Sequence, residues 1–236
     1  MVSPLNTLKG RIAGLVPARA YPVLKGARAS VFYDPDRVKA PHGRDSVPET
    51  LSTEHVRDAE VVPSREEMLE AFPQGGRVAE LGTDEGDFSE QILSITDPDE
   101  LYLIDVWEST EFSDRSVEEV KTRYAEQIAD GTVEVLPERP DVALERFEDG
   151  SLDWAYIDTT HTYEQTLNEL RICREKVKSD GVIAGHDYCL GDVPEGRRYG
   201  VIAAVHEFCA ESEMELTYLS LETHGHSSFA IERLDS

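Results

Sequence analysis

The fold of this chain is decided by Val78-Ala79-Glu80-Leu81-Gly82-Thr83-Asp84-Glu85-Gly86-Asp87 and, further on, by Leu101-Tyr102-Leu103-Ile104-Asp105. A short apolar run ends in an acidic residue and two glycines, a helical pattern follows, and a second apolar run ends in an aspartate. Glycine lets the backbone turn sharply, and a helix beginning near Asp84 points its first N–H groups at a ligand. Asp105 can accept hydrogen bonds from two ribose hydroxyls. The pattern predicts a β-α-β unit that binds a nucleoside.

The glycine spacing separates this unit from a dinucleotide-binding one. A dinucleotide turn reads G-x-G-x-x-G and is tightened around a pyrophosphate, whereas Gly82 and Gly86 form G-x-x-x-G, with Glu80 two residues before. Acidic side chains crowd the loop at Asp84, Glu85 and Asp87. They disfavour a pyrophosphate but tolerate a ligand that carries a sulfonium and an ammonium. The pattern E-x-G-x-x-x-G resembles motif I of the class I S-adenosylmethionine-dependent methyltransferases.

The resemblance implies where the cofactor is held. The matching family residues hold the amino-acid part and the ribose of the cofactor, here at Glu80, Gly82 and Asp105. Trp107, just beyond, is placed to lean on the adenine ring, although a core or interface aromatic is an equal alternative. The full set of expected cofactor contacts is Glu80, Gly82, Thr83, Gly86, Asp105, Trp107 and Asp158.

Strand and helix patterns alternate along the rest of the chain. We expect strands at 78–82, 101–106, 132–136, 152–158 and 181–186, and helices near 64–72, 85–95, 114–129, 140–147, 163–178 and 199–212. Two last strand-like runs, at 216–221 and 228–231, have no helix between them, and so short a connection requires an antiparallel pair. The predicted fold class is α/β: a doubly wound, mostly parallel seven-stranded sheet with an antiparallel last strand, the topology of class I methyltransferases.

Composition limits the class of protein. The chain has 236 residues, 39% of them hydrophobic, which fits a methyltransferase domain at 61–236 and an N-terminal extension at 1–60 that covers the substrate or serves as an oligomer arm. No apolar run approaches the roughly 18 residues of a membrane span, and none fits a secretory leader. Three cysteines without C-x-x-C spacing indicate reduced thiols in a cytoplasmic protein.

Charge bears on the partners. The net charge of −25, from 48 acidic and 23 basic residues, disfavours nucleic acid and leaves a small-molecule acceptor. Residues 1–44 nevertheless hold eight Lys/Arg against two Asp. Such a basic arm can be tied to its own domain, clamp across the acidic body, touch an anionic membrane surface or pair with another subunit in a homo-oligomer.

A second group of polar residues follows two later strands. Asp158 ends the run 152–158 and His161 comes three residues later, while His186 and Asp187 end the run 181–186. Because neighbouring parallel strands end at one edge of a sheet, Asp158, His186 and Asp187 are expected to meet and to chelate a divalent cation, Mg²⁺ or Mn²⁺. His161 is the candidate general base.

At these residues the sequence resembles a more specific family within the class I methyltransferases. Asp158-x-x-His161-x-Tyr163 and the run Gly181-Val182-Ile183-Ala184-Gly185-His186-Asp187-Tyr188 are similar to the family that groups macrolide-sugar O-methyltransferases with cephalosporin hydroxylase-like proteins. The resemblance implies Mg²⁺ on Asp158 and on the pair at 186–187, with His161 as the base. Two departures matter: Thr159-Thr160 replaces the usual Gly-Asp, and His186 replaces a carboxylate. Since Mg²⁺ prefers oxygen, the metal is Mn²⁺- or Fe²⁺-like, or His186 is not a ligand, or no metal binds.

Together these features predict metal-assisted O-methylation of a small hydroxylated acceptor, such as a sugar or natural product, with S-adenosylmethionine as donor. Two alternatives stay open: a hydroxylase-like enzyme that uses the same metal group, and a cofactor-binding protein that has lost catalysis. A nicotinamide-dependent oxidoreductase fits poorly, because G-x-G-x-x-G is missing. His224 and His226 are interpreted as turn residues, since neither has an acidic partner suitably placed in sequence.

Overall fold

The computed structural model describes residues 47–107, 117–192, 196–222 and 226–234. Contacts divide the chain into two units, one of residues 1–43 and 191–198, the other of 44–190 and 199–236. In the described part of the first unit, the Arg197 N–H donates to the Asp192 carbonyl at 3.0 Å. The second unit holds the sheet. The boundary expected at residue 60 stays a prediction, and most of the expected extension lies outside the described residues.

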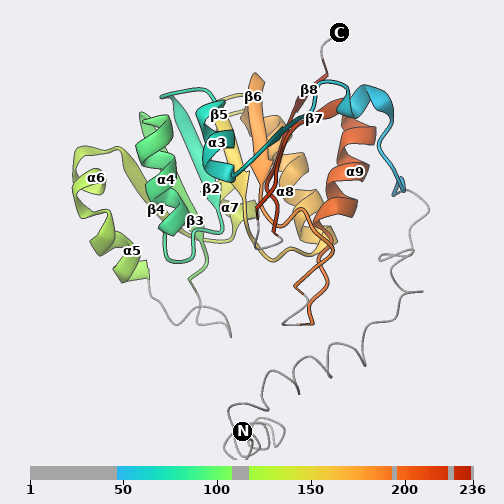
Figure 1. Ribbon diagram of the computed structural model, residues 1–236. Helices are drawn as coiled ribbons and strands as arrows, with labels where there is room; N and C mark the ends of the chain where they lie inside the picture. The colour runs from blue at the N-terminus through green and yellow to red at the C-terminus, as the bar shows by residue number, and fades with distance from the viewer. Residues whose placement is uncertain (1–46, 108–116, 193–195, 223–225, 235–236) are drawn as a thin grey trace, which may run out of the picture. The chain divides into compact units, whose positions relative to one another are not determined.

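The second unit is built on one eight-stranded sheet, in the order β1-β7-β8-β6-β5-β2-β3-β4 (Figure 1). The strands are β1 (Glu60–Val62), β2 (Arg77–Leu81), β3 (Glu100–Asp105), β4 (Val133–Pro137), β5 (Leu152–Ile157), β6 (Val177–Gly185), β7 (Met214–Ser220) and β8 (Phe229–Arg233). β8 runs antiparallel to both β6 and β7, and every other pair is parallel. The predicted fold class and the antiparallel last strand are confirmed.

The predicted count of seven strands is wrong by one. The additional strand, β1, is three residues long and pairs with β7, where Glu60 faces Tyr218. Its sequence, Glu-Val-Val before Pro63, is too short to show a strand period. The strand therefore forms because β7 offers it an edge.

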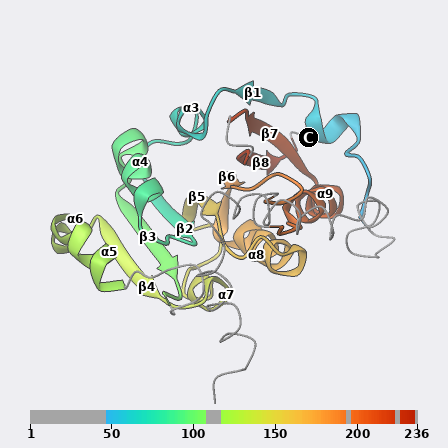
Figure 2. The ribbon, with the colours of Figure 1, turned by 60° about the horizontal axis from the view of Figure 1, so that its bottom comes forward.

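Helices cover both faces of the sheet, with α3 (Arg65–Glu70), α4 (Asp87–Thr96), α5 (Val117–Arg123) and α6 (Ala125–Asp130) on one side and α7 (Pro140–Leu144), α8 (Tyr163–Lys176) and α9 (Val201–Ser212) on the other (Figure 2). A 3₁₀ helix, η2 (Thr53–Val56), precedes β1. Each face has its own apolar core: Leu103 belongs to the cluster on one side, with Met68 and Trp154, and the next residue, Ile104, belongs to the cluster on the other side, which includes Phe208. This alternation explains why the strand sequences are apolar throughout.

Two helix starts bear on the site. Ser64 caps α3 by accepting the Glu67 N–H at 3.4 Å. The helix expected near Asp84 begins instead at Asp87, because Gly86 takes the left-handed conformation as its N-cap.

Among the described residues, no helix has both the length and the apolar character that a bilayer crossing requires.

The strand order fixes where a ligand binds. The chain leaves β2 for β3 and β4 on one side, then returns to β5 and β6 on the other. Open α/β sheets bind ligands beyond the carboxyl ends of the strands at such a reversal. The carboxyl ends of β2, β3, β5 and β6 are therefore the place to look for a site.

Candidate functional site

Gly82 lies where the ends of three strands meet. Its N–H donates to the Ile104 carbonyl at 2.8 Å, and the Asp158 N–H donates to the Leu81 carbonyl at 2.7 Å. A Cβ atom on Gly82 would lie 1.9 Å from the Asp158 carbonyl oxygen, and its φ is +90°. Both observations require glycine here. The turn after β2 is thus pressed against the start of the β5–α8 loop, which carries the second group of polar residues.

The rest of the turn is equally constrained. Asp84 has a φ of +49° and Gly86 a φ of +79°, and the Tyr124 hydroxyl donates to the Gly86 carbonyl. Thr83 is 4% exposed, and within the described residues its Oγ1 has no hydrogen-bond partner. A buried hydroxyl without a partner costs free energy unless a ligand or water satisfies it. Thr83 is therefore available to a molecule bound over the turn.

Asp105 joins the ends of β2 and β3. Its Oδ2 accepts the Asp84 N–H at 2.9 Å and its Oδ1 accepts the Trp107 N–H at 3.2 Å. The Trp107 indole N–H donates back to the Asp84 carbonyl at 2.9 Å. The carboxylate is thereby oriented before any ligand arrives, and its remaining lone pairs can still accept ribose hydroxyls.

Glu80 is the buried carboxyl of this half of the site. It is 2% exposed and accepts a hydrogen bond from Ser89. Burial raises the pKa of Glu80 to about 8, and the negative charges of Asp158 and Asp105 add to the rise. A cation bound nearby would favour its ionised form.

Arg65, which the sequence did not single out, is the neighbouring positive charge. Its guanidinium lies 4.3 Å over the ring of Phe88. Its charge lowers the pKa of both Glu80 and Asp158, against the larger effect of burial. Arg65 comes from α3, well before the motif, and no spacing in the sequence links it to either carboxyl.

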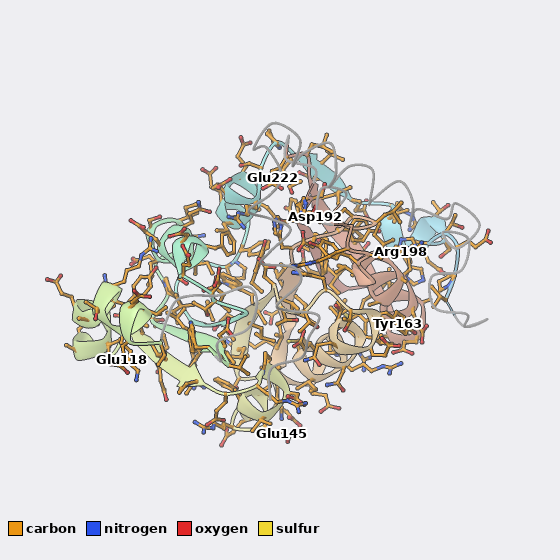
Figure 3. The ribbon with its side chains drawn as sticks, turned by 90° about the horizontal axis from the view of Figure 1, so that it is seen from below. Glu118, Glu145, Tyr163, Asp192, Arg198 and Glu222 are labelled. Atoms are coloured by element: carbon orange, nitrogen blue, oxygen red, sulfur yellow. The ribbon has the colours of Figure 1, made fainter. Side chains whose placement is uncertain are left out.

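The second half of the site brings His161 between two carboxylates. His161 Nδ1 lies 3.0 Å from Asp187 Oδ2 and 3.9 Å from Asp158 Oδ1. The His161 ring also packs against Tyr199, with centroids 4.6 Å apart. Figure 3 looks onto this edge of the sheet, with Tyr163 labelled at the start of α8. Three predicted residues, Asp158, His161 and Asp187, are therefore neighbours.

Their ionisation differs. Burial raises the pKa of Asp158 to about 7, and Asp187 adds to this while His161 opposes it. Burial also tends to raise the pKa of Asp187, but hydrogen bonding and the charge of His161 outweigh it and hold this pKa below the usual value. Asp187 is thus the stable anion that holds the imidazole, and Asp158 is the carboxyl whose charge depends on a nearby cation.

His186 is not brought into this group. Its Nδ1 lies 3.0 Å from Ser228 Oγ, and Ser228 Oγ lies 3.0 Å from the Tyr156 hydroxyl. Burial lowers the pKa of His186 to about 4. In the described part of the chain, the residue that shares a potential metal position with Asp158 and Asp187 is His161. The expected set of Asp158, His186 and Asp187 is therefore corrected at His186.

His226 lies in the segment between β7 and β8, as its interpretation as a turn residue expects, but it has an acidic partner that is distant in the sequence. Its Nδ1 contacts Asp187 Oδ1. It belongs, with Asp187 and Cys189, to a second group of potential metal ligands. The contact arises because β8 returns next to β6, which no local spacing reveals. His224 lies outside the described residues.

Thr159, one of the departures from the family pattern, has a partner of its own. Its hydroxyl donates to Glu169 at 2.7 Å, and the Gln165 amide donates to the other oxygen of that carboxyl at 2.7 Å. Burial raises the pKa of Glu169 to about 7. Thr159 therefore satisfies a buried carboxyl beneath the site.

Backbone strain collects at the site. Among the described residues, six non-glycine residues have positive φ. Two of them cap helices, and the other four lie in the loops that follow the strands of the site: Asp84, Trp107, His161 and Asp187. Such conformations cost about 1–3 kcal/mol each and cluster where geometry serves a ligand.

Comparison with known proteins agrees with the fold. Residues 79–188 match a family model described as a methyltransferase domain. A SAM dependent methyltransferase from Aquifex aeolicus superposes with a TM-score of 0.53 at 14% identity, over 84% of this chain and 98% of that one. An rRNA methylase from Streptococcus thermophilus gives 0.52 at 12% identity, over 72% and 95%.

A third solved structure contains SAH. SMU.1697c from Streptococcus mutans, in complex with SAH, superposes with a TM-score of 0.53 at 13% identity, over 72% of this chain and 96% of that one. At these identities the structural likeness concerns the fold alone. Curated protein sequences give no match.

Proposed function

Since this chain carries a methyltransferase domain of the class I fold, we propose that it transfers the methyl group of S-adenosylmethionine to a hydroxyl oxygen of a small acceptor, with help from a divalent cation. The observation that carries the proposal is the position of His161. It lies 3.0 Å from Asp187, on a loop pressed against the cofactor turn at Gly82. A proton acceptor is thus held next to the place where a methyl donor is expected.

The side chains support the following chemistry. Asp187 accepts the Nδ1 proton of His161, which fixes the tautomer in which Nε2 takes up a proton. The acceptor hydroxyl gives its proton to Nε2 while its oxygen attacks the methyl carbon in line with the departing sulfur. The carbon–sulfur bond breaks, and the electron pair leaves on sulfur as a neutral thioether. Apart from this proton transfer, the enzyme's contribution is to hold the reacting atoms in near-attack geometry.

The cation rests on a fit of donor atoms. Asp158 and Asp187 each offer a carboxylate oxygen, within 4.8 Å of each other and of a His161 nitrogen, and the cation would be held by the two carboxylates, so that His161 keeps its role as the base. Burial keeps the pKa of Asp158 at about 7, so a cation would stabilise its charged form. Two carboxylates suit a hard divalent cation such as Mg²⁺ or Mn²⁺. When bound, such an ion would lower the pKa of the acceptor hydroxyl.

The cofactor would lie over the ends of β2 and β3. Asp105 is oriented for the ribose by its two backbone hydrogen bonds. Glu80, a buried carboxyl, would face the cationic amino-acid part, and Thr83 offers a hydroxyl without a partner in the described part of the chain. The acidic turn again favours a cationic ligand over a phosphate.

The acceptor class follows from charge. A net charge of −25 repels polyanions, which favours a small hydroxylated molecule over RNA. A cytoplasmic location and a homo-oligomer, with the basic segment 1–44 as a contact between subunits, are kept as proposals alongside it.

Calorimetric titration of the full chain tests the proposal most directly. S-adenosylmethionine should bind, and binding should be lost in Asp105→Ala. Transfer of a labelled methyl group to a panel of sugars and phenols should then depend on Mn²⁺ and on His161. Binding without transfer to any acceptor would favour the catalytically altered protein, transfer to RNA would overturn the acceptor class, and hydroxylated products would identify the hydroxylase-like alternative.

A further inference from the structure

Beside the His161 group lies a second set of ligand side chains, from Asp187, Cys189 and His226. We propose that these three residues form a binding site for a thiophilic divalent metal of the Zn²⁺ class. The set combines one carboxylate, one thiol and one imidazole, and each offers one atom within 4.8 Å of the others. The inference does not depend on methyl transfer, since a metal can bind here whatever the reaction.

The spacing is compatible with a zinc ion. In tetrahedral zinc sites, bonds of about 2.0–2.3 Å put neighbouring ligand atoms about 3.3–3.8 Å apart. Asp187 Oδ1 and His226 Nδ1 are already in contact, and Cys189 lies within the same 4.8 Å limit. Small side-chain rotations would therefore complete three ligands and leave a fourth position open.

The backbone holds these residues together without a metal. The Cys189 N–H donates to the Asp187 carbonyl at 2.6 Å, in a tight turn that starts from the left-handed conformation of Asp187. The Tyr188 N–H donates to the Ser227 carbonyl at 2.8 Å. This second bond ties the turn after β6 to the segment that leads into β8 and carries His226. A preformed site lowers the entropy that metal binding must overcome.

The ligand chemistry separates this set from the hard cation proposed at Asp158. Thiolate sulfur and imidazole nitrogen select Zn²⁺ and its neighbours in the transition series, whereas Mg²⁺ takes oxygen. Metal binding would release the Cys189 proton, because a coordinated thiol is a thiolate. None of the three cysteines forms a disulfide, and Cys189 is the partly exposed one.

Asp187 connects the two groups. Its Oδ2 faces His161 at 3.0 Å, and its Oδ1 faces His226. A metal bound through Oδ1 would fix the carboxylate and, through Oδ2, the orientation of the His161 ring. Cys189 and His226 would then be positioning residues for the base.

Cobalt gives a readout that does not depend on activity. The full chain is stripped with a chelator and titrated with Co²⁺, whose thiolate complexes have an intense charge-transfer band. We expect this band in the wild type and in Cys209→Ser, a control at a buried cysteine on α9, and its loss in Cys189→Ser. Zn²⁺ should displace Co²⁺. Replacing Cys189 by Ser or His226 by Ala should weaken Zn²⁺ binding by at least about 100-fold, since even outer-shell changes cost 10- to 100-fold.

Three outcomes overturn the site: no thiolate band in the wild type, a band that survives in Cys189→Ser, or Zn²⁺ affinity that is unchanged in His226→Ala. Circular dichroism of each variant excludes unfolding as the cause of a loss. S-adenosylmethionine binding is measured on the same samples. Cofactor binding without a cobalt band defeats the metal site alone, and a cobalt band without cofactor binding defeats the proposed function alone.

Discussion

The two halves of the site are built in different ways. The cofactor half, at the ends of β2 and β3, comes from one stretch of chain, residues 80–107, and its carboxylate is tied down by backbone N–H groups. The acid–base half gathers side chains from the loop after β5, the turn after β6 and the segment before β8. Its carboxylate is held by imidazoles. The first half is local geometry, and the second exists only in the folded sheet.

The sharpest way to test this division is to remove the base. His161→Ala should reduce turnover by about 10²- to 10⁴-fold, the usual contribution of a general base. S-adenosylmethionine affinity should stay within about twofold, because His161 belongs to the other half. Steady-state methyl transfer and calorimetry on the same preparation measure the two effects. Unchanged turnover would remove His161 from the mechanism.

A glycine pair tests whether the halves depend on each other structurally. Gly82 and Gly131 both have a φ of +90°, but a Cβ on Gly82 would strike the Asp158 carbonyl, whereas one on Gly131 would meet nothing within 4 Å. Gly131→Ala should lower the free energy of unfolding by about 1–2 kcal/mol from backbone strain alone. Gly82→Ala should cost about 1–3 kcal/mol more from the clash.

Urea unfolding of both variants measures that difference. Equal losses would show that the turn after β2 can move away from the β5–α8 loop. The two halves would then not be held together at Gly82.

Titration of Glu80 should make the affinity of the cofactor half for S-adenosylmethionine depend on pH. With a pKa of about 8, Glu80 is mostly protonated at pH 7. A cationic ligand prefers its ionised form, so S-adenosylmethionine affinity should rise up to about tenfold between pH 7 and pH 9. Calorimetry in buffers of different ionisation enthalpy should detect proton release. Glu80→Gln should abolish both effects, and an affinity independent of pH in the wild type would contradict the role.

The stability of the fold should change with pH in the opposite direction to the cofactor affinity. The folded protein keeps the Glu80 proton to about pH 8, whereas the unfolded chain releases it near the ordinary glutamate pKa of 4.5. Between these values the folded state binds more protons, so this group lowers stability as pH rises. Glu80→Gln should flatten the decline, which thermal unfolding across this pH range measures.

Replacing Arg65 is expected to have the smallest effect. It should change both halves of the site at once, because its charge acts on a carboxyl in each. Its charge lowers the pKa of Glu80 and of Asp158. Arg65→Met should therefore move the pH dependence of cofactor binding and of turnover upward together, by less than about one pH unit. Arg57→Met, at an exposed position before β1, is the matched control and should move neither. A shift of only one profile would mean that Arg65 serves one half.

How much the sequence could predict depends on the same division. Strand–turn–helix order, the tight turn at Gly82 and the position of Asp105 at the end of β3 are predictable, because each depends on neighbours in the chain. The meeting of Asp158 and Asp187 is predictable too, since parallel strands end at one edge, and His161 follows Asp158 by three residues. Their roles, like those of the cofactor residues, stay predictions.

What could not be predicted depends on the direction of side chains and on contacts between segments that are distant in the sequence. His186 and Asp187 are adjacent and both follow β6, and the left-handed conformation of Asp187 turns the chain there, so His186 faces Ser228 while Asp187 faces His161. Choosing between them requires the conformation of this turn. His226 and Arg65 arrive from distant segments, and β1 is too short to show a period.

The insertion of β8 between β6 and β7 has a consequence for the order of assembly. Until residues 229–233 join the sheet, β6 and β7 each have one edge without a partner, the edge that β8 later covers. Exposed strand edges favour association between incomplete chains. The same docking event delivers His226 to Asp187 and Ser228 to His186. During biosynthesis, the closing of the sheet and the arrival of the last imidazole are therefore one step.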